Sequence, residues 1–224
     1  MVYRLCLNYK RLAYITEWVE YPDIQEHCER LGIAATGIKP DGSPYYTLPA
    51  IHDPSTGAYI SESFAIAVYL DKTYPDTPPI FPNGTVGLQA PFVEVFTTKA
   101  IRTWPFIFGR TCANLNPRSA DYMSNKLKNL PSESKDEAES KQMWTQARED
   151  MSTANEWYSA GGNKGPFMLG ETLSWADIVV SAHFLCWKLL LGLDSQKWKD
   201  IESWDEGRWA SLMTAVVKHT ETSA

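Results

Sequence analysis

The chain has 224 residues, of which 44% are apolar and 21% are charged, a composition ordinary for a globular protein with one large or two modest cores. Its formal net charge of −6, without a cluster of Lys and Arg, argues against a nucleic-acid surface. The start, MVYRLCLNYK, has no apolar signal region, and the longest apolar run, around residues 185–193, contains Lys188. Neither a secretory signal nor a membrane span is predicted, so we expect a cytosolic protein that binds a small molecule.

The cysteines and histidines are scattered along the chain rather than grouped in a motif. No C-x-x-C pair and no H-E-x-x-H motif is present, so we predict reduced thiols and no metal site. The cysteines are Cys6, Cys28, Cys112 and Cys186, and the histidines are His27, His52, His183 and His219.

The first ten residues have two interpretations. Alternating apolar positions, from Tyr3 to Tyr9, are typical of a strand, whereas a short apolar run of this kind is also compatible with a helix. Periodicity alone leaves both open.

Residues 45–75, YYTLPAIHDPSTGAYISESFAIAVYLDKTYP, predict a strand, a bend, a strand, a tight turn, a strand and then a helix. Pro49 lies inside the second run and cannot donate to a strand ladder, which places it at an edge, at a bulge or after a cis bond. The backbone that Pro49 leaves unpaired is therefore available to another partner.

Glu62 and Ser63 stand where the last of these strands turns into the helix. The free N–H groups of a helix start attract a carboxylate, and Glu62 is placed to take an ammonium group. A ligand that carries both groups on one carbon would fit. The alternative is that the two residues only cap the helix.

Residues 74–86, YPDTPPIFPNGTV, are rich in Pro and predict an extended linker. Helical patterns follow at 86–112, with a bend at Pro105, and at 138–158. We therefore predict a first domain at 1–76, a linker at 77–85 and an all-helical domain at 86–224.

The segment GETLSWADIVVSAHF contains the clearest helix start of the second domain. Ser174 is predicted as the N-cap with Asp177 as its capping-box partner, and Leu173 can pack on Ile178 as a hydrophobic staple. Asp177 is therefore interpreted as a capping residue rather than as a catalytic acid.

The Leu48-Pro49 pair, the DPSTG turn and the Glu62-Ser63 pair together resemble the glutathione transferase family. The sequence of the segment is most similar to that of the fungal transferases related to bacterial β-etherases. The resemblance implies a thioredoxin-like first domain, a cis bond before Pro49 and glutathione as co-substrate. It also implies that the backbone of Leu48 pairs with the cysteinyl part of glutathione and that Glu62 and Ser63 bind its γ-glutamyl end. Lys39 is a candidate for the glycyl carboxylate.

The resemblance extends to the capping box and to the aromatic residues of the second domain. In this family the hydrophobic co-substrate lies between the domains, against a helix that here carries Ile101, Trp104, Phe106 and Phe108. Trp104 and Phe108 are the predicted pocket residues for a planar phenolic compound, and the alternative is that these aromatic side chains are core. The family is usually homodimeric.

The chain departs from the family pattern at its start. Family members open with a strand and a loop that bears a catalytic Tyr, Ser or Cys, whereas RLCLNYK resembles the end of the first helix and LAYITEWVEY the second strand. We therefore expect that strand one and the catalytic loop are missing, that the sheet is weak, and that no catalytic residue can be named. Tyr3, Cys6 and Tyr9 are the nearest substitutes.

These observations predict a thioredoxin-like α/β domain without its first strand, followed by an all-α domain. The function implied by the resemblance is attack of the glutathione thiolate on a hydrophobic, aromatic electrophile, including ether cleavage, in a detoxification role. The alternative is a protein that binds glutathione or hydrophobic compounds without turnover, and a further alternative is that the sequence lacks the beginning of a longer enzyme.

Overall fold

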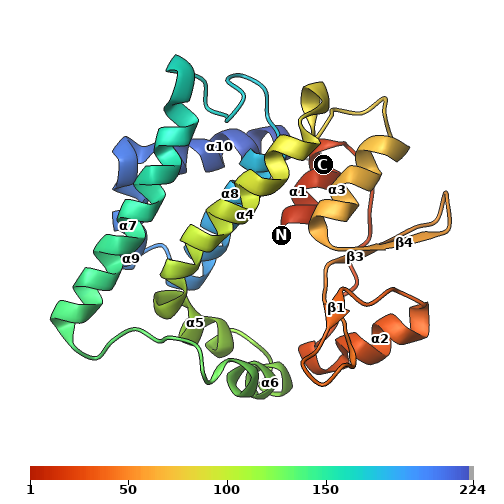
Figure 1. Ribbon diagram of the computed structural model, residues 1–224, viewed down its shortest axis with the longest axis horizontal. Helices are drawn as coiled ribbons and strands as arrows, with labels where there is room; N and C mark the ends of the chain where they lie inside the picture. The colour runs from red at the N-terminus through yellow and green to blue at the C-terminus, as the bar shows by residue number, and fades with distance from the viewer. Residues whose placement is uncertain (222–224) are drawn as a thin grey trace.

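The computed structural model describes residues 1–221, and it places an α/β half beside a helical half (Figure 1). The first half, drawn in red to orange, contains two separate two-stranded antiparallel sheets, β1–β2 and β3–β4, together with three α-helices. They are α1 (Val2–Tyr9), α2 (Ile24–Leu31), β1 (Gly37–Ile38), β2 (Pro44–Tyr45), β3 (Ala50–Asp53), β4 (Ala58–Ser61) and α3 (Ser63–Thr73).

The start of the chain is helical, as the resemblance suggested, but the strand expected after it is absent. Helix α1 buries Leu5, Cys6 and Leu7 and contacts α3, α8 and α10. Residues 12–20, which include most of LAYITEWVEY, have no regular secondary structure. A strand needs a neighbour for its backbone groups, and each described sheet contains only its own two strands. The predicted strand over this run is therefore wrong.

The β3–β4 hairpin is closed by Asp53, the first residue of the DPSTG turn. One carboxylate oxygen of Asp53 accepts from Ser55, and the other accepts from the hydroxyls of Tyr69 and Tyr74, both at 2.7 Å. Burial acts to raise the pKa of Asp53, but the hydrogen bonds from Tyr69, Ser55 and Tyr74 outweigh it and hold the pKa well below its usual range. The carboxylate thus ties the hairpin to α3.

A buried ion pair joins α1 to α3 and to the segment that leads into the second half. The Lys10 ammonium, 1% exposed, donates to Asp71 at 2.8 Å and to the carbonyl of Pro78 at 3.3 Å. Asp71 also accepts from the N–H groups of Ile80 and Phe81 at 2.9 and 2.8 Å. The carboxylate therefore accepts from one cation and two backbone donors.

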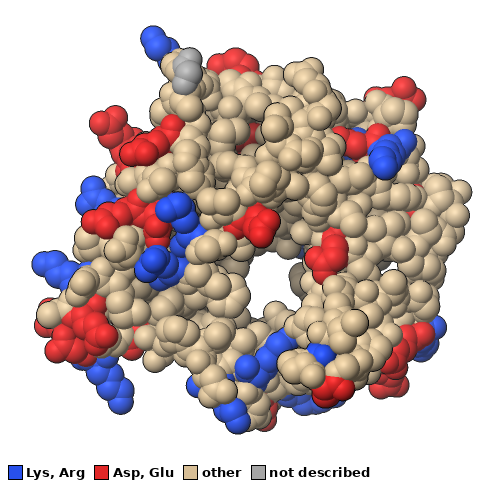
Figure 2. All heavy atoms as spheres, viewed as in Figure 1, with Lys and Arg blue, Asp and Glu red and all other residues tan. Residues whose placement is uncertain are grey.

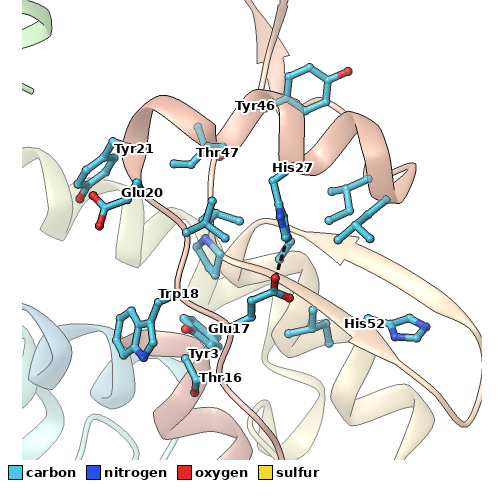
Figure 3. Close-up of a pocket in the computed structure, with 18 of the residues that line it drawn as sticks. Tyr3, Thr16, Glu17, Trp18, Glu20, Tyr21, His27, Tyr46, Thr47 and His52 are labelled. Carbon is cyan, nitrogen blue, oxygen red and sulfur yellow. Dashed lines mark ion pairs between the residues drawn. The ribbon is translucent and has the colours of Figure 1, made fainter. Parts of the chain in front are cut away.

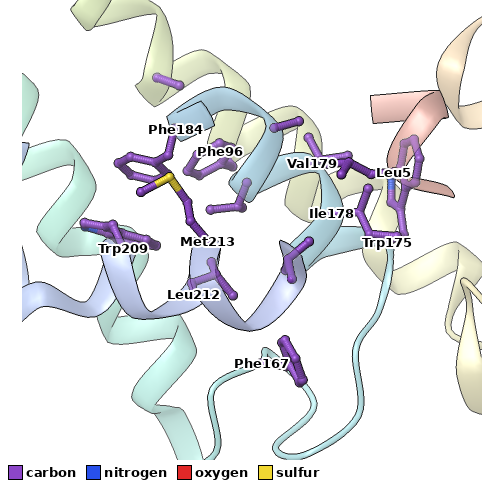
Figure 4. Close-up of a cluster of buried hydrophobic side chains, with 14 of the residues drawn as sticks. Leu5, Phe96, Phe167, Trp175, Ile178, Val179, Phe184, Trp209, Leu212 and Met213 are labelled. Carbon is purple, nitrogen blue, oxygen red and sulfur yellow. The ribbon is translucent and has the colours of Figure 1, made fainter. Parts of the chain in front are cut away.

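The second half consists of helices packed around α8, as Figure 4 shows for its core. Trp209 stacks on Phe184 with ring centroids 4.8 Å apart, and Trp175 belongs to the same buried cluster as Leu5 of the first half (Figure 4). The break predicted near Pro105 occurs just before it, since Pro105 lies in the first turn of α5. The helices are α4 (Val86–Ala100), α5 (Trp104–Ala113), α6 (Pro117–Leu127), α7 (Glu137–Ser159), α8 (Trp175–Leu191), α9 (Gln196–Ser203) and α10 (Arg208–Thr220).

The predicted capping box at the start of α8 is confirmed. Ser174 and Asp177 exchange both capping hydrogen bonds, and Asp177 also accepts from the backbone N–H of Met168 at 2.8 Å. Leu173 and Ile178, the predicted staple, are buried in the same apolar cluster. Burial raises the pKa of Asp177 to about 6, and the hydrogen bonds from Met168 and Ser174 limit that rise.

Ionisation of Asp177 destabilises the folded state, and a measurement of the free energy of unfolding can detect this loss. The pKa is about 6 in the folded state and about 3.9 in an unfolded chain. Between these values the folded state binds more protons, so stability falls as the pH rises from about 4 to 6. We predict that wild type loses up to about 3 kcal/mol over this window relative to Asp177→Asn.

Urea unfolding of both proteins from pH 4 to pH 7 measures this difference, and Asp121→Asn on α6, whose side chain is exposed, serves as the control. A free energy of unfolding that depends on pH in the same way in wild type and Asp177→Asn would contradict the raised pKa of Asp177.

Candidate functional site

A cavity of about 1570 Å³ lies between the two halves of the molecule. Its walls come from α1, from residues 12–27, from residues 45–54 and from residues 114–126. Figure 2 shows the corresponding opening in the surface, and Figure 3 shows side chains such as Tyr3, Trp18 and His52 around it. The cavity is larger than the 300–1,000 Å³ of typical small-molecule pockets, so it has room for more than one ligand.

The predicted residues Leu48 and Pro49 lie on the wall of this cavity. The peptide bond between them is cis, as predicted. Leu48 is 37% exposed, and within residues 1–221 neither its N–H nor its C=O group has a hydrogen-bond partner. The C=O group of Leu48 can therefore accept a hydrogen bond from a peptide-like ligand, and its N–H group can donate one to it.

Glu62 and Ser63 lie at the start of α3, outside the residues that line the cavity. Glu62 is exposed, has a φ of 72° and makes no side-chain capping bond, which removes the interpretation of its carboxylate as a helix cap. Its N–H donates to the carbonyl of Pro49 at 3.2 Å, and its carboxylate accepts from Thr47 at 3.1 Å. A residue with a side chain reaches this φ at a cost of about 1–3 kcal/mol, and such residues cluster at functional sites.

Thr47 is a member of this arrangement that the sequence analysis missed. Its hydroxyl lies 3.0 Å from that of Thr36 and 3.1 Å from the Glu62 carboxylate, and Thr47 lines the cavity. It therefore links the cavity wall to the start of α3. Its position directly before Leu48 was the only indication in the sequence.

Lys39, the candidate for a carboxylate partner, also lines the cavity. Its ammonium donates to the side-chain carbonyl of Gln25 at 3.1 Å, and no carboxylate in the described part of the chain pairs with it. The structure thus brings Lys39, Leu48 and Pro49 to one cavity.

The opposite wall is α6, a helix that the sequence analysis did not single out. The backbone N–H of Tyr21 donates to Ser119 at 3.1 Å, and the Glu20 carboxylate accepts from Ser119 and Asn116. Nearby, Arg118 and Asp23 form a two-pronged ion pair with distances of 2.8 and 3.1 Å. These partners are roughly a hundred residues apart in sequence, so no local pattern indicates the contact.

A second contact between α6 and the first half involves Lys126. Its ammonium donates to the hydroxyl of Tyr45 at 2.7 Å and lies 4.9 Å from the centre of that ring and 5.9 Å from the ring of Tyr122. All three residues line the cavity. The cavity wall therefore carries a cation that lies beside two phenol rings.

None of the nearest substitutes for a catalytic residue is activated. Burial raises the pKa of the Cys6 thiol, and the charge of Asp71 raises it further. Burial likewise raises the pKa values of Tyr3 and Tyr9. A nucleophile or base needs a lowered pKa to ionise near neutral pH, so these three groups stay protonated there.

Trp104 and Phe108 line a different cavity, of about 320 Å³, inside the helical half. Their rings stack with centroids 5.9 Å apart, and Ile101 and Met143 complete the apolar wall. Phe106 is instead buried against Trp144. This small cavity shares no lining residue with the large cavity, so Trp104 and Phe108 do not lie beside Leu48.

Within residues 1–221, no helix is both long and apolar enough to cross a membrane. Over the same residues, no group of three or more His, Cys, Asp or Glu side chains is arranged to hold a metal ion.

Comparison with known proteins identifies both halves. Residues 3–73 match the family of glutathione S-transferase N-terminal domains, and residues 87–219 match the family of glutathione S-transferase C-terminal domains. A curated relative, the glutathione S-transferase-like protein ustS of Aspergillus flavus, is 27% identical over 97% of this chain and 82% of its own length.

Solved structures of fungal transferases superpose on the whole chain. A glutathione S-transferase of Ceriporiopsis subvermispora, crystallised in complex with glutathione, is 40% identical with a TM-score of 0.91 over 99% of this chain and 90% of its own. Glutathione transferase GSTFuA3 of Phanerochaete chrysosporium is 33% identical, with a TM-score of 0.89 over 100% of this chain and 90% of its own. The likeness confirms the predicted combination of a thioredoxin-like domain and a helical domain, and the chain belongs to the glutathione S-transferase family.

Proposed function

We propose that this chain binds glutathione in the large cavity and at the start of α3. In this proposal the cysteinyl part pairs with the backbone of Leu48, the γ-glutamyl end meets Glu62 and Ser63, and Lys39 takes the glycyl carboxylate. The observation that carries the proposal is the unpaired backbone of Leu48 beside an uncapped helix start whose carboxylate is not used as a cap. The glutathione complex of the Ceriporiopsis relative supports the same ligand.

The reaction proposed is attack of the glutathione thiolate on a hydrophobic, aromatic electrophile. A carbon–sulfur bond forms, the bond to the leaving group breaks, and the leaving group departs with the electron pair; cleavage of an aryl ether is one such case. The volume of the cavity supports simultaneous binding of glutathione and a second molecule. We name no catalytic residue, because the pKa values of the three candidate groups, those of Tyr3, Cys6 and Tyr9, are all raised.

The proposal includes a cytosolic detoxification role and a homodimer. The proposed domains remain 1–76 and 86–224 with a linker at 77–85, in keeping with the end of α3 and the start of α4.

Replacement of Glu62 tests the glutathione site. Loss of a charged hydrogen-bond partner costs about 1.5–3 kcal/mol, so Glu62→Ala should weaken glutathione binding by at least about tenfold in titration calorimetry. Glu62→Gln keeps the shape and should show a loss of the same order. Glu26→Ala, an exposed residue of α2 outside the cavity, should bind like wild type. Retained affinity in Glu62→Ala would exclude this site.

The second candidate function is binding of hydrophobic compounds without turnover. The cavity at Trp104 and Phe108 favours it, because a compound held there does not meet glutathione at Leu48. We propose that these two stacked rings hold a planar aromatic compound.

Trp104→Ala tests this second function. Trp104 is 42% exposed, so its truncation should change the melting temperature little while it weakens binding of 2-naphthol by about fivefold or more. Trp18→Ala, at an 80% exposed residue of the large cavity, is the matched control. If only Trp18→Ala binds 2-naphthol more weakly, then 2-naphthol binds in the large cavity and not beside Trp104.

A further inference from the structure

Helix α6 presents one polar face to the large cavity. Tyr122 and Lys126 follow Ser119 by three and seven residues, so the three side chains share one side of the helix. All three residues line the cavity. Ser119 anchors the near end of this face to Glu20 and Tyr21. Seven residues of helix span about 10 Å, so Lys126 stands well away from that anchor.

The ammonium of Lys126 has no charged partner in the described chain. It makes one hydrogen bond, to the hydroxyl of Tyr45, and no carboxylate of residues 1–221 lies within ion-pair distance. An ammonium carries three donors, so two remain for another acceptor. Lys126 is thus a cation at the cavity with unused donors.

The carboxylates that line the same cavity are engaged elsewhere. Glu20 accepts from Asn116 and Ser119, Asp53 accepts from Tyr69 and Tyr74, and Glu17 lies 3.9 Å from His27, as Figure 3 shows. None of them compensates the charge of Lys126. A negative group on a bound molecule would do so.

The two phenol rings beside Lys126 add an aromatic surface to the cation. Tyr122 is 40% exposed, so part of its side chain is open to a planar group. An aromatic ring that stacks on Tyr122 or Tyr45 would bring a ring substituent to the ammonium. A carboxylate suits the two unused donors, because it offers two acceptor oxygens.

We propose that Lys126, with Tyr45 and Tyr122, selects aromatic co-substrates that carry a carboxylate. This inference rests on the proposed function and narrows its substrate class. It assigns to Lys126 a specificity role in the large cavity that is separate from the glutathione residues.

Titration calorimetry with 3-nitrobenzoate and 3-nitrobenzamide tests the proposal, because the two probes differ in one group. Wild type should bind the benzoate about threefold to fivefold more tightly, the range of a solvent-exposed ion pair, and 1 M NaCl should reduce the preference. Lys126→Met should remove the preference and leave the affinity for 3-nitrobenzamide unchanged. Lys128→Met, an exposed lysine next to α6 and outside the cavity, should behave like wild type.

Glutathione titrations of the same proteins separate this proposal from the proposed function. Lys126→Met should bind glutathione like wild type. A benzoate preference that survives in Lys126→Met, or that wild type lacks, overturns the role of Lys126. Loss of glutathione affinity in Lys126→Met also overturns it, since Lys126 would then serve glutathione. If wild type fails to bind glutathione, the proposed function fails whatever the benzoate result.

Discussion

The arrangement of the two halves depends on the buried pair between Lys10 and Asp71. Asp71 receives the ammonium from α1 and two N–H groups from the segment at Ile80 and Phe81, and the carbonyl of Ile80 accepts in turn from Trp175 at the start of α8. One carboxylate thereby joins the first helix, the last helix of the α/β half and the central helix of the second half. An ammonium that is 1% exposed is tolerated only with its partner, since loss of one member of a buried pair costs about 3–5 kcal/mol.

This constraint positions the candidate site as well as the core. Helix α3 is fixed near its end by Asp71 and at its start by the hydrogen bond from Glu62 to Pro49. The cavity opens beside that start, and the docking of residues 20–23 on α6 closes its other side. The unpaired backbone of Leu48, the carboxylate of Glu62 and the cation of Lys126 therefore lie on segments that are joined by hydrogen bonds.

Local chemistry explains which features could be predicted from the sequence. The hairpin, the start of α3 and the capping box of Ser174 and Asp177 each depend on residues within a few positions of one another. The local pattern left an edge, a bulge or a cis bond open for Pro49, and only the family resemblance implied the cis bond that the structure contains. The strand expected at residues 12–21 failed because a strand depends on a neighbour that a local pattern does not reveal. Thr47, α6 and Lys126 were missed for the same reason: their roles arise from contacts across the fold.

The cavity and the start of α3 together form the proposed glutathione site. A thermal melt of the 224-residue chain across a glutathione titration tests it most directly, because a ligand that binds only the folded state stabilises it by about 2.7 kcal/mol at a hundred times its dissociation constant. We expect a saturable rise in the melting temperature. A melting temperature that does not change with glutathione would contradict it.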